Sequence, residues 1–132
     1  MHTRLSLREP LAWASLLLAA LFFCLAVLFV LAPAPAAAFF GLATNEPSAL
    51  TFVRAVGLRD LALASYLAGL TLAGDRRSLT ILLAATVVIP VGDMLLLALA
   101  GAGTPAHFLL HAASLLCFAA LAWWARRSRP RS

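Results

Sequence analysis

Four long apolar runs, separated by short polar or proline-containing connections, constrain this chain more than any other feature. Several of the runs approach or exceed the roughly 20 residues that a helix needs to cross the hydrocarbon core of a bilayer. The 132 residues are 64% hydrophobic and 11% charged, whereas about 25% of the residues of a soluble domain are charged. A soluble domain of this length could not bury so much apolar surface, because small domains leave much of their area exposed. The sequence therefore predicts one all-α domain over residues 1–132, an integral membrane four-helix bundle with spans at about 11–32, 49–73, 79–100 and 105–125.

The first run could be taken for a signal peptide, because small residues follow it at 33–38. Signal-peptide cores hold only about 7–15 apolar residues, and this run holds about 22, so we expect the first span to be retained. The connection 33–51 is the only long one. We expect its aromatic pair, Phe39 and Phe40, to rest in the membrane interface, and Pro47 suits the first turn of the next helix.

The placement of arginine predicts the orientation of the bundle. Two arginines precede the first run, two lie in the turn 74–78 and four follow the last run, whereas the connections 33–51 and 101–104 have none. Because arginine and lysine accumulate in short cytoplasmic flanks, we expect both termini in the cytoplasm. The tryptophans then all fall at the inner interface, which suits an amphipathic indole; they are Trp13, Trp123 and Trp124.

The formal charge of +5 does not indicate a nucleic-acid-binding protein. The arginines sit at helix ends, no aromatic-basic motif accompanies them, and such ends suit contact with anionic membrane lipid. Arginine without lysine, together with heavy alanine and leucine usage, indicates a GC-rich bacterial genome and hence a bacterial inner membrane. Cys24 and Cys117 lie in separate runs at depths about 8 Å apart, too far for a disulfide, and we expect two buried thiols.

The second apolar run holds an arginine and an aspartate side by side, Arg59 and Asp60. Such residues are rare in a membrane segment unless they pair with other polar groups. At helical rise, Asp60 lies about 12 Å below the outer surface, Asp93 lies at a similar depth in the third span, and His111 lies about 9 Å deep in the fourth. His107 falls nearer that surface. We therefore expect these ionisable groups to converge in the outer half of the bilayer.

Helical phase supports the same convergence. Asp60 shares a face with Gly57 and Ala64, a small-residue pattern that lets membrane helices approach closely. His107 and His111 lie one turn apart on a single face of the fourth run, so this polar stripe is expected to face the bundle. The first run has no polar face, and we expect a peripheral, lipid-facing helix that offers a contact for a homodimer.

The polar groups support three functions, which the sequence leaves open. The first is a structural ionic network or a site for a small lipophilic ligand. The second is a membrane-embedded acid–base enzyme, an isomerase or cyclase in which Asp60 and Asp93 serve as proton donor and acceptor and His111 as relay. The third is a small transporter or a subunit of a proton-coupled carrier. The residues assigned to the ligand site or polar network are Arg54, Arg59, Asp60, Tyr66, Asp93, His107 and His111.

We expect neither a metal nor a cofactor. His107 and His111 have the spacing of two metal ligands, but the glutamate of the H-E-x-x-H motif is missing and a nearby arginine disfavours a cation. The sequence has no Cys-x-x-Cys pair for quinone redox chemistry and no glycine-rich phosphate loop.

A family resemblance rests on four parts of the sequence: Arg54-x-x-Gly57-Leu-Arg59-Asp60, the turn Gly74-Asp75-Arg76-Arg77, Pro90-x-Gly92-Asp93, and His111. Together they resemble the small four-helix bacterial membrane proteins grouped as a domain of unknown function. The glycine-x-arginine-aspartate motif in the second span is the most specific part, and the similarity covers about residues 10–125. The resemblance implies the membrane fold and its topology, and it implies no activity.

Overall fold

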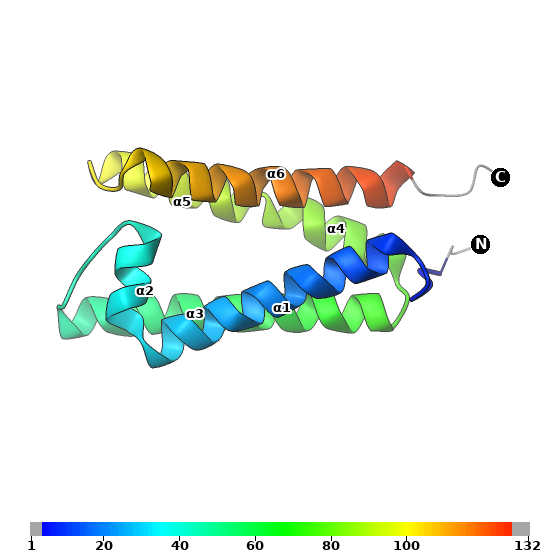
Figure 1. Ribbon diagram of the computed structural model, residues 1–132, viewed down its shortest axis with the longest axis horizontal. Coiled ribbons are helices and arrows are strands. Elements are labelled where there is room, and N and C mark those ends of the chain that lie inside the picture. Colours follow the sequence, from blue (N-terminus) through cyan, green and yellow to red (C-terminus); the bar gives the residue numbers. More distant parts are fainter. Residues whose placement is uncertain (1–3, 128–132) are drawn as a thin grey trace.

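The computed structural model describes residues 4–127, and these residues form six helices and no strand (Figure 1). By length and composition, four segments are suited to cross a membrane: α1, α3, α4 together with α5, and α6. The prediction of an all-α fold with four long apolar helical segments is therefore confirmed. The helices are α1 (Pro10–Leu31), α2 (Pro33–Phe40), α3 (Pro47–Leu72), α4 (Arg76–Thr86), α5 (Val88–Leu99) and α6 (Pro105–Arg127).

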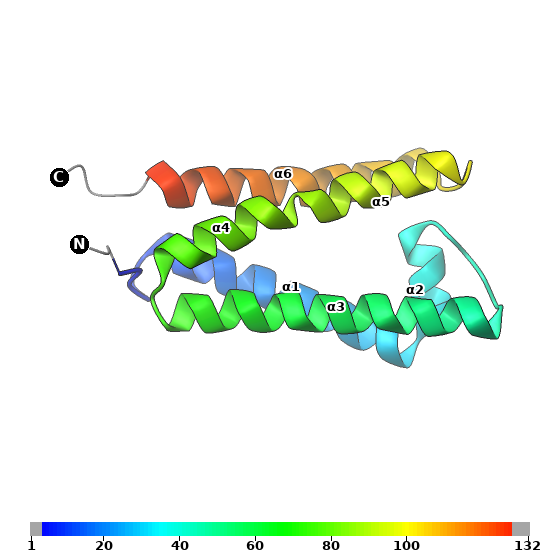
Figure 2. The ribbon, with the colours of Figure 1, turned by 180° about the vertical axis from the view of Figure 1, so that it is seen from behind.

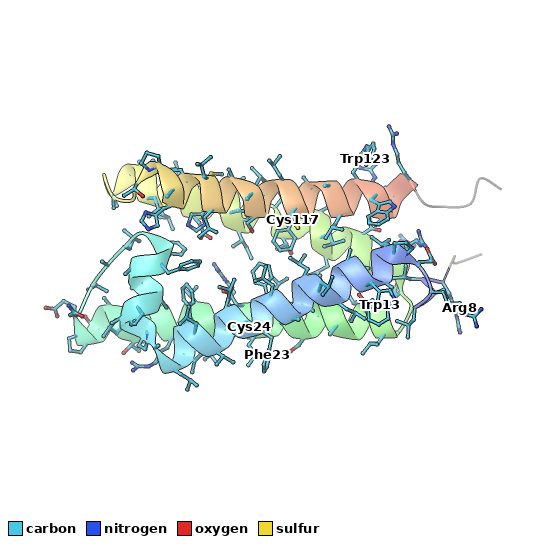
Figure 3. The ribbon with its side chains drawn as sticks, viewed as in Figure 1. Arg8, Trp13, Phe23, Cys24, Cys117 and Trp123 are labelled. Atoms are coloured by element: carbon cyan, nitrogen blue, oxygen red, sulfur yellow. The ribbon has the colours of Figure 1, made fainter. Side chains whose placement is uncertain are left out.

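The helices form two layers, which Figures 1 and 2 show from opposite sides. α1 crosses α3 in one layer, while α4, α5 and α6 make up the other. α1 begins and α6 ends at the same end of the bundle, and α2 stands between the layers toward the opposite end. Arg8, Trp13 and Trp123 lie at the end where α1 begins (Figure 3). Arg129 and Arg131, which the sequence-based orientation also used, lie outside the described residues.

α1 packs along α3, which corrects the expectation of a peripheral first helix. Gly57 permits the close approach, because a Cβ atom there would lie 2.8 Å from the Cβ of Phe29 and 3.1 Å from the carbonyl oxygen of Ala26. The buried face of α1 also includes the small residues Ala12 and Ala19. Lipid tails and a protein interior are equally apolar, so a membrane helix can have a buried face without any polar stripe to mark the other side.

The third apolar segment is interrupted at Val87, between α4 and α5. Pro90 explains the interruption, since it has no N–H to donate to the carbonyl of Thr86 and its ring crowds that carbonyl. The hydroxyl of Thr86 donates to the carbonyl oxygen of Leu82 at 2.7 Å. Asp93 follows Pro90 by three residues and lies on the part of the segment after the break.

Residues 33–40, predicted as part of the long connection 33–51, form the short helix α2. Pro33 occupies its first turn, where a missing N–H removes no helical hydrogen bond. Gly41 ends the helix in the left-handed conformation, with φ of 110°. Phe39 and Phe40 line a pocket, and their predicted place in the membrane interface stays a prediction.

The chain before α1 is attached to the start of α4. The backbone N–H of Leu5 donates to the carbonyl oxygen of Gly74 at 2.9 Å, and Arg76 forms an ion pair with Glu9. Arg76 is only 4% exposed. Sequence reasoning treated this arginine as a topology signal and missed its distant acidic partner.

Candidate functional site

Asp60 is the most buried member of a polar cluster that α3 places among apolar side chains, with 4% of the residue exposed. Its neighbour Arg59 begins from an adjacent helix position, and adjacent positions do not face each other. The long arginine side chain folds back, so that its Nε and Nη2 both donate to Oδ1 of Asp60, at 3.2 and 3.1 Å. The side chain of Arg59 nevertheless remains 40% exposed.

Asp93 joins the cluster from α5 and connects α3 to α6. Its Oδ1 lies 4.0 Å from Nη1 of Arg59, and its Oδ2 lies 3.7 Å from Nδ1 of His111. Three helices therefore bring Arg59, Asp60, Asp93 and His111 together. The sequence predicted that these four side chains converge, from their depth along the helices and from helical phase.

The imidazole of His111 is oriented by α2. Its Nε2 lies 3.2 Å from the carbonyl oxygen of Phe40, and because a carbonyl oxygen only accepts, Nε2 carries the hydrogen. The ring of Phe40 meets the imidazole edge to face, with centroids 4.9 Å apart. A neutral His111 would then turn the lone pair of Nδ1 toward Oδ2 of an ionised Asp93. One further proton, on Nδ1 or on Oδ2, removes that repulsion.

His107 lies outside the ion-pair cluster and holds α2 against α6. Its Nδ1 accepts a hydrogen bond from the backbone N–H of Thr104 at 2.9 Å, and its Nε2 lies 3.2 Å from the carbonyl oxygen of Ala38. A neutral imidazole with its hydrogen on Nε2 satisfies both contacts. His107 and His111 thus contact carbonyl groups in the last turn of α2, where regular helical bonding ends. Within residues 4–127, no group of three or more His, Cys, Asp or Glu is placed to hold a metal ion.

A pocket of about 310 Å³ lies beside the cluster. Apolar side chains form most of its wall, and Arg59, Asp60, Asp93 and His111 form its polar edge. Among the apolar and sulfur-bearing residues of the wall are Phe22, Leu25 and Phe29 from α1, Phe39 from α2, and Cys117 and Phe118 from α6.

The two cysteines differ in their relation to this pocket. Cys117 lines it and Cys24 does not, and both can be followed in Figure 3. Both thiols are free and exposed, so the expectation of unpaired cysteines is confirmed and the expectation of buried ones is wrong. Each helix in a bundle of this size has an outer face, and the apolar character of a thiol does not decide which face it occupies.

Two of the predicted polar residues, Arg54 and Tyr66, are not brought into the cluster. Both are exposed, Tyr66 at 59%, and neither lines the pocket. Arg54 lies five positions before Arg59, about 140° away around the helix. Tyr66 shares a helical phase with Arg59 but lies about 10 Å along the axis, while the side chain of Arg59 turns toward Asp60.

Sequence reasoning missed the contribution of α2 to the site. The carbonyl oxygens of Ala38 and Phe40 orient the two histidines, and Phe39 and Phe40 close part of the pocket. A signal for this helix was present, because proline at a first turn, a run of alanine and a following glycine are typical helix start and stop signals. The sequence prediction assigned these residues to a long connection between the first two spans.

Comparison with known proteins places the chain in a family. Residues 19–125 match the family described as Domain of unknown function (DUF4267), which covers all of the cluster and most of the pocket wall. No curated protein and no solved structure matches the chain. The match extends over well more than half of the sequence, and the chain therefore belongs to the DUF4267 family.

Proposed function

We propose that this chain is a multi-pass protein of the bacterial inner membrane that binds one small lipophilic molecule in the pocket beside the polar cluster. The composition of the pocket carries this proposal: apolar side chains form most of the wall and four ionisable side chains meet at one edge. Ligand pockets combine a largely apolar lining with a few polar groups that fix orientation. The volume of about 310 Å³ falls at the small end of the usual range of about 300–1,000 Å³.

The openness of the cluster supports a ligand site over a purely structural network. A network that only fixed the helices would be enclosed by them, yet 40% of the Arg59 side chain is exposed. Arg59, Asp60 and Asp93 all line the pocket. Arg59 uses only its Nε and Nη2 in hydrogen bonds to Asp60, and a ligand with a polar end is a partner for its remaining donors.

The glycine-x-arginine-aspartate motif supports the same function. Gly57 lets α1 lie close to α3, and this contact puts Phe29 of α1 in the pocket wall. Arg59 and Asp60, which follow within one turn, then form the polar edge. We propose that the motif builds one side of the binding site.

The distribution of basic residues supports an orientation with both termini in the cytoplasm. α1 begins and α6 ends at the same end of the bundle, and Arg8 and Arg126 flank that end. Arg127 lies over the ring of Trp123, with 4.0 Å between the guanidinium carbon and the ring centroid. Arginine and tryptophan side by side suit a cytoplasmic membrane interface, and with this orientation we propose that the pocket opens toward the outer leaflet.

Native mass spectrometry of the purified protein tests the proposed function. We expect the folded protein to carry one retained lipophilic molecule. Leu25→Trp, which fills the pocket wall, should abolish the added mass, while Leu17→Trp on the exposed face of the same helix should preserve it. A wild-type protein without any retained molecule, or equal occupancy of the pocket in the two variants, would contradict the proposal.

One observation favours a second function, a membrane-embedded acid–base enzyme of the isomerase or cyclase type. At the pocket edge Nδ1 of His111 lies 3.7 Å from Oδ2 of Asp93, and this function would use the pair as proton donor and acceptor beside the bound molecule. A proton transferred to and from carbon would exchange with solvent. In D₂O the enzyme should therefore introduce deuterium into C–H positions of the bound molecule, and Asp93→Asn should not. An unchanged ligand mass assigns the pocket to binding alone.

A further inference from the structure

The polar edge of the pocket consists of two pairs, each with an acidic and a basic side chain. The charges of Arg59 and Asp60 cancel within their ion pair. Nδ1 of His111 lies 3.7 Å from Oδ2 of Asp93, and a proton on either atom makes this second pair neutral overall. No other charged side chain lines the pocket, and the remaining lining residues are apolar apart from one serine and one cysteine. A charged ligand group at this edge would add an uncompensated charge in an apolar cavity, which is costly.

The same edge offers hydrogen-bond donors to a ligand. A guanidinium group has five N–H donors, and Arg59 directs its Nε and Nη2 to Oδ1 of Asp60. Its Nη1 lies 4.0 Å from Asp93, which is beyond hydrogen-bond distance. A ligand oxygen at this edge would accept a charge-assisted hydrogen bond from Arg59 without displacing Asp60.

The size of the pocket and its open side indicate where the rest of the ligand lies. A volume of about 310 Å³ is at the small end of the range of ligand pockets, about 300–1,000 Å³. The lining residues Leu21, Leu110 and Cys117 are exposed on the outer surface, so the wall between α1 and α6 is open to the side. Figure 1 shows α1 running away from α6 toward α2. A longer chain therefore leaves through this side, into the surrounding acyl chains.

Building on the proposed function, we infer that the ligand is an amphiphile with a single apolar chain and an uncharged, oxygen-bearing head, such as a long-chain alcohol or ketone. The head oxygen accepts a hydrogen bond from Arg59, and the chain passes between α1 and α6 into the bilayer. An alcohol also donates to a carboxylate oxygen of the cluster, whereas a ketone only accepts.

The labelling rate of Cys117 reports which head group occupies the pocket. Cys24→Ala protein, in vesicles of dioleoylphosphatidylcholine, is reacted with pyrene maleimide in the presence of equal mole fractions of five twelve-carbon additives. These are 1-dodecanol, 2-dodecanone, dodecylammonium, dodecanesulfonate and dodecane. We expect 1-dodecanol, 2-dodecanone or both to slow the labelling of Cys117 by about tenfold, the scale of one lost hydrogen bond to a charged group. The other three should slow it less than about twofold, because they lack either the acceptor or the neutral charge.

Two matched variants complete the experiment. In Cys117→Ala protein, the remaining Cys24 should label at the same rate with every additive, since it lies outside the pocket. Arg59→Gln leaves the charge of Asp60 uncompensated, so protection should pass from the neutral additives to dodecylammonium. Retained protection by 1-dodecanol or 2-dodecanone in Arg59→Gln would overturn the assigned head contact.

The outcomes separate this inference from the proposed function. Equal protection by dodecane would leave a lipophilic pocket and overturn the head-group assignment, and strongest protection by either ion would do the same. If no additive slows the labelling of Cys117 and the purified protein carries no retained molecule, the proposed function fails as well.

Discussion

Gly57 couples a helix contact to the chemistry of the site. Its Cα faces α1, and Arg59 and Asp60 follow within one turn of the same helix. Any side chain at this position moves α3 away from α1, and the wall of the pocket moves with it. A glycine conformational preference is not involved, because the residue lies inside a regular helix. The missing side chain is the property that matters.

Gly57→Ala should lower stability by about 1–3 kcal/mol, the usual cost of overpacking. The added Cβ would lie 2.8 Å from the Cβ of Phe29 and 2.9 Å from Cγ2 of Val30. Gly69→Ala on the same helix is the control: its Cβ would meet nothing within 4 Å, so it should be neutral or gain up to about 1 kcal/mol of helix propensity. Thermal unfolding in detergent measures both. A Gly57→Ala protein as stable as the wild type would contradict the close contact.

The short helix α2 is held by side chains from elsewhere in the chain. It has eight residues, too few to be stable alone. His107 and His111 on α6 contact its carbonyl groups at Ala38 and Phe40. Because Phe39 and Phe40 line the pocket, the docking of α2 decides how well the pocket is closed at that end.

His107→Ala should loosen α2 without touching the ion-pair cluster. It removes the contact to the carbonyl of Ala38 and the acceptor for the N–H of Thr104, which together cost about 1–3 kcal/mol. Hydrogen exchange measured by mass spectrometry should accelerate in residues 33–41 and at the start of α6. Exchange in residues 60–70 of α3 serves as the reference. Unchanged protection of residues 33–41 would show that α2 docks independently of His107.

The segment before α1 is joined to α4 through Glu9, and this contact predicts a pH dependence. The pKa of Glu9 is lowered, chiefly because its carboxylate accepts a hydrogen bond from the backbone N–H of Ser6 and further because Arg76 lies beside it, while partial burial opposes the shift. A depressed folded-state pKa means that the stabilisation is present above the unfolded-state pKa and is lost as pH falls through the folded-state value.

Glu9→Gln should therefore be less stable than the wild type at pH 6–7, and the difference should shrink as the pH falls below about 4, the ordinary range for a glutamate. Melting temperatures of the two proteins from pH 3 to 7 provide the test. Subtracting the two curves removes contributions from the other carboxylates. A difference that is constant with pH would show that the ionised form of Glu9 contributes nothing to stability.

At the scale of the whole molecule, the orientation predicts which ends reagents can reach. In a background without Cys24 and Cys117, Asn45→Cys should react with a membrane-impermeant maleimide in intact cells. Leu7→Cys should react only after the cells are opened, because positively charged flanks stay in the cytoplasm. Both positions are exposed, so accessibility within the fold does not separate them. The reverse pattern would invert the proposed topology.

The sequence was sufficient to predict the long apolar helices and the convergence of four polar side chains. Run length determines which segments can be long apolar helices, and depth with helical phase aligns Asp60, Asp93 and His111. The packing of α1 could not be obtained in this way, because its buried and lipid-facing sides are equally apolar. Its buried small residues, Ala12 and Ala19 among them, were the available signal. The role of α2 could not be predicted, because the histidines are oriented by backbone carbonyl groups. Every residue has such a group, so the residue type does not show which one is used.

The ion pair between Glu9 and Arg76 joins positions 67 apart in the sequence. A chain made from its amino end contains all of α1 and α3 before Arg76 is added. The acid at the start of the first helix therefore gains this partner only when the nascent chain has returned to the end of the bundle from which it started. This ion pair therefore forms only after α4 has begun, and a chain arrested before residue 76 has only one of the two contacts, the hydrogen bond between Leu5 and Gly74, to join the segment before α1 to the end of the α1–α3 hairpin.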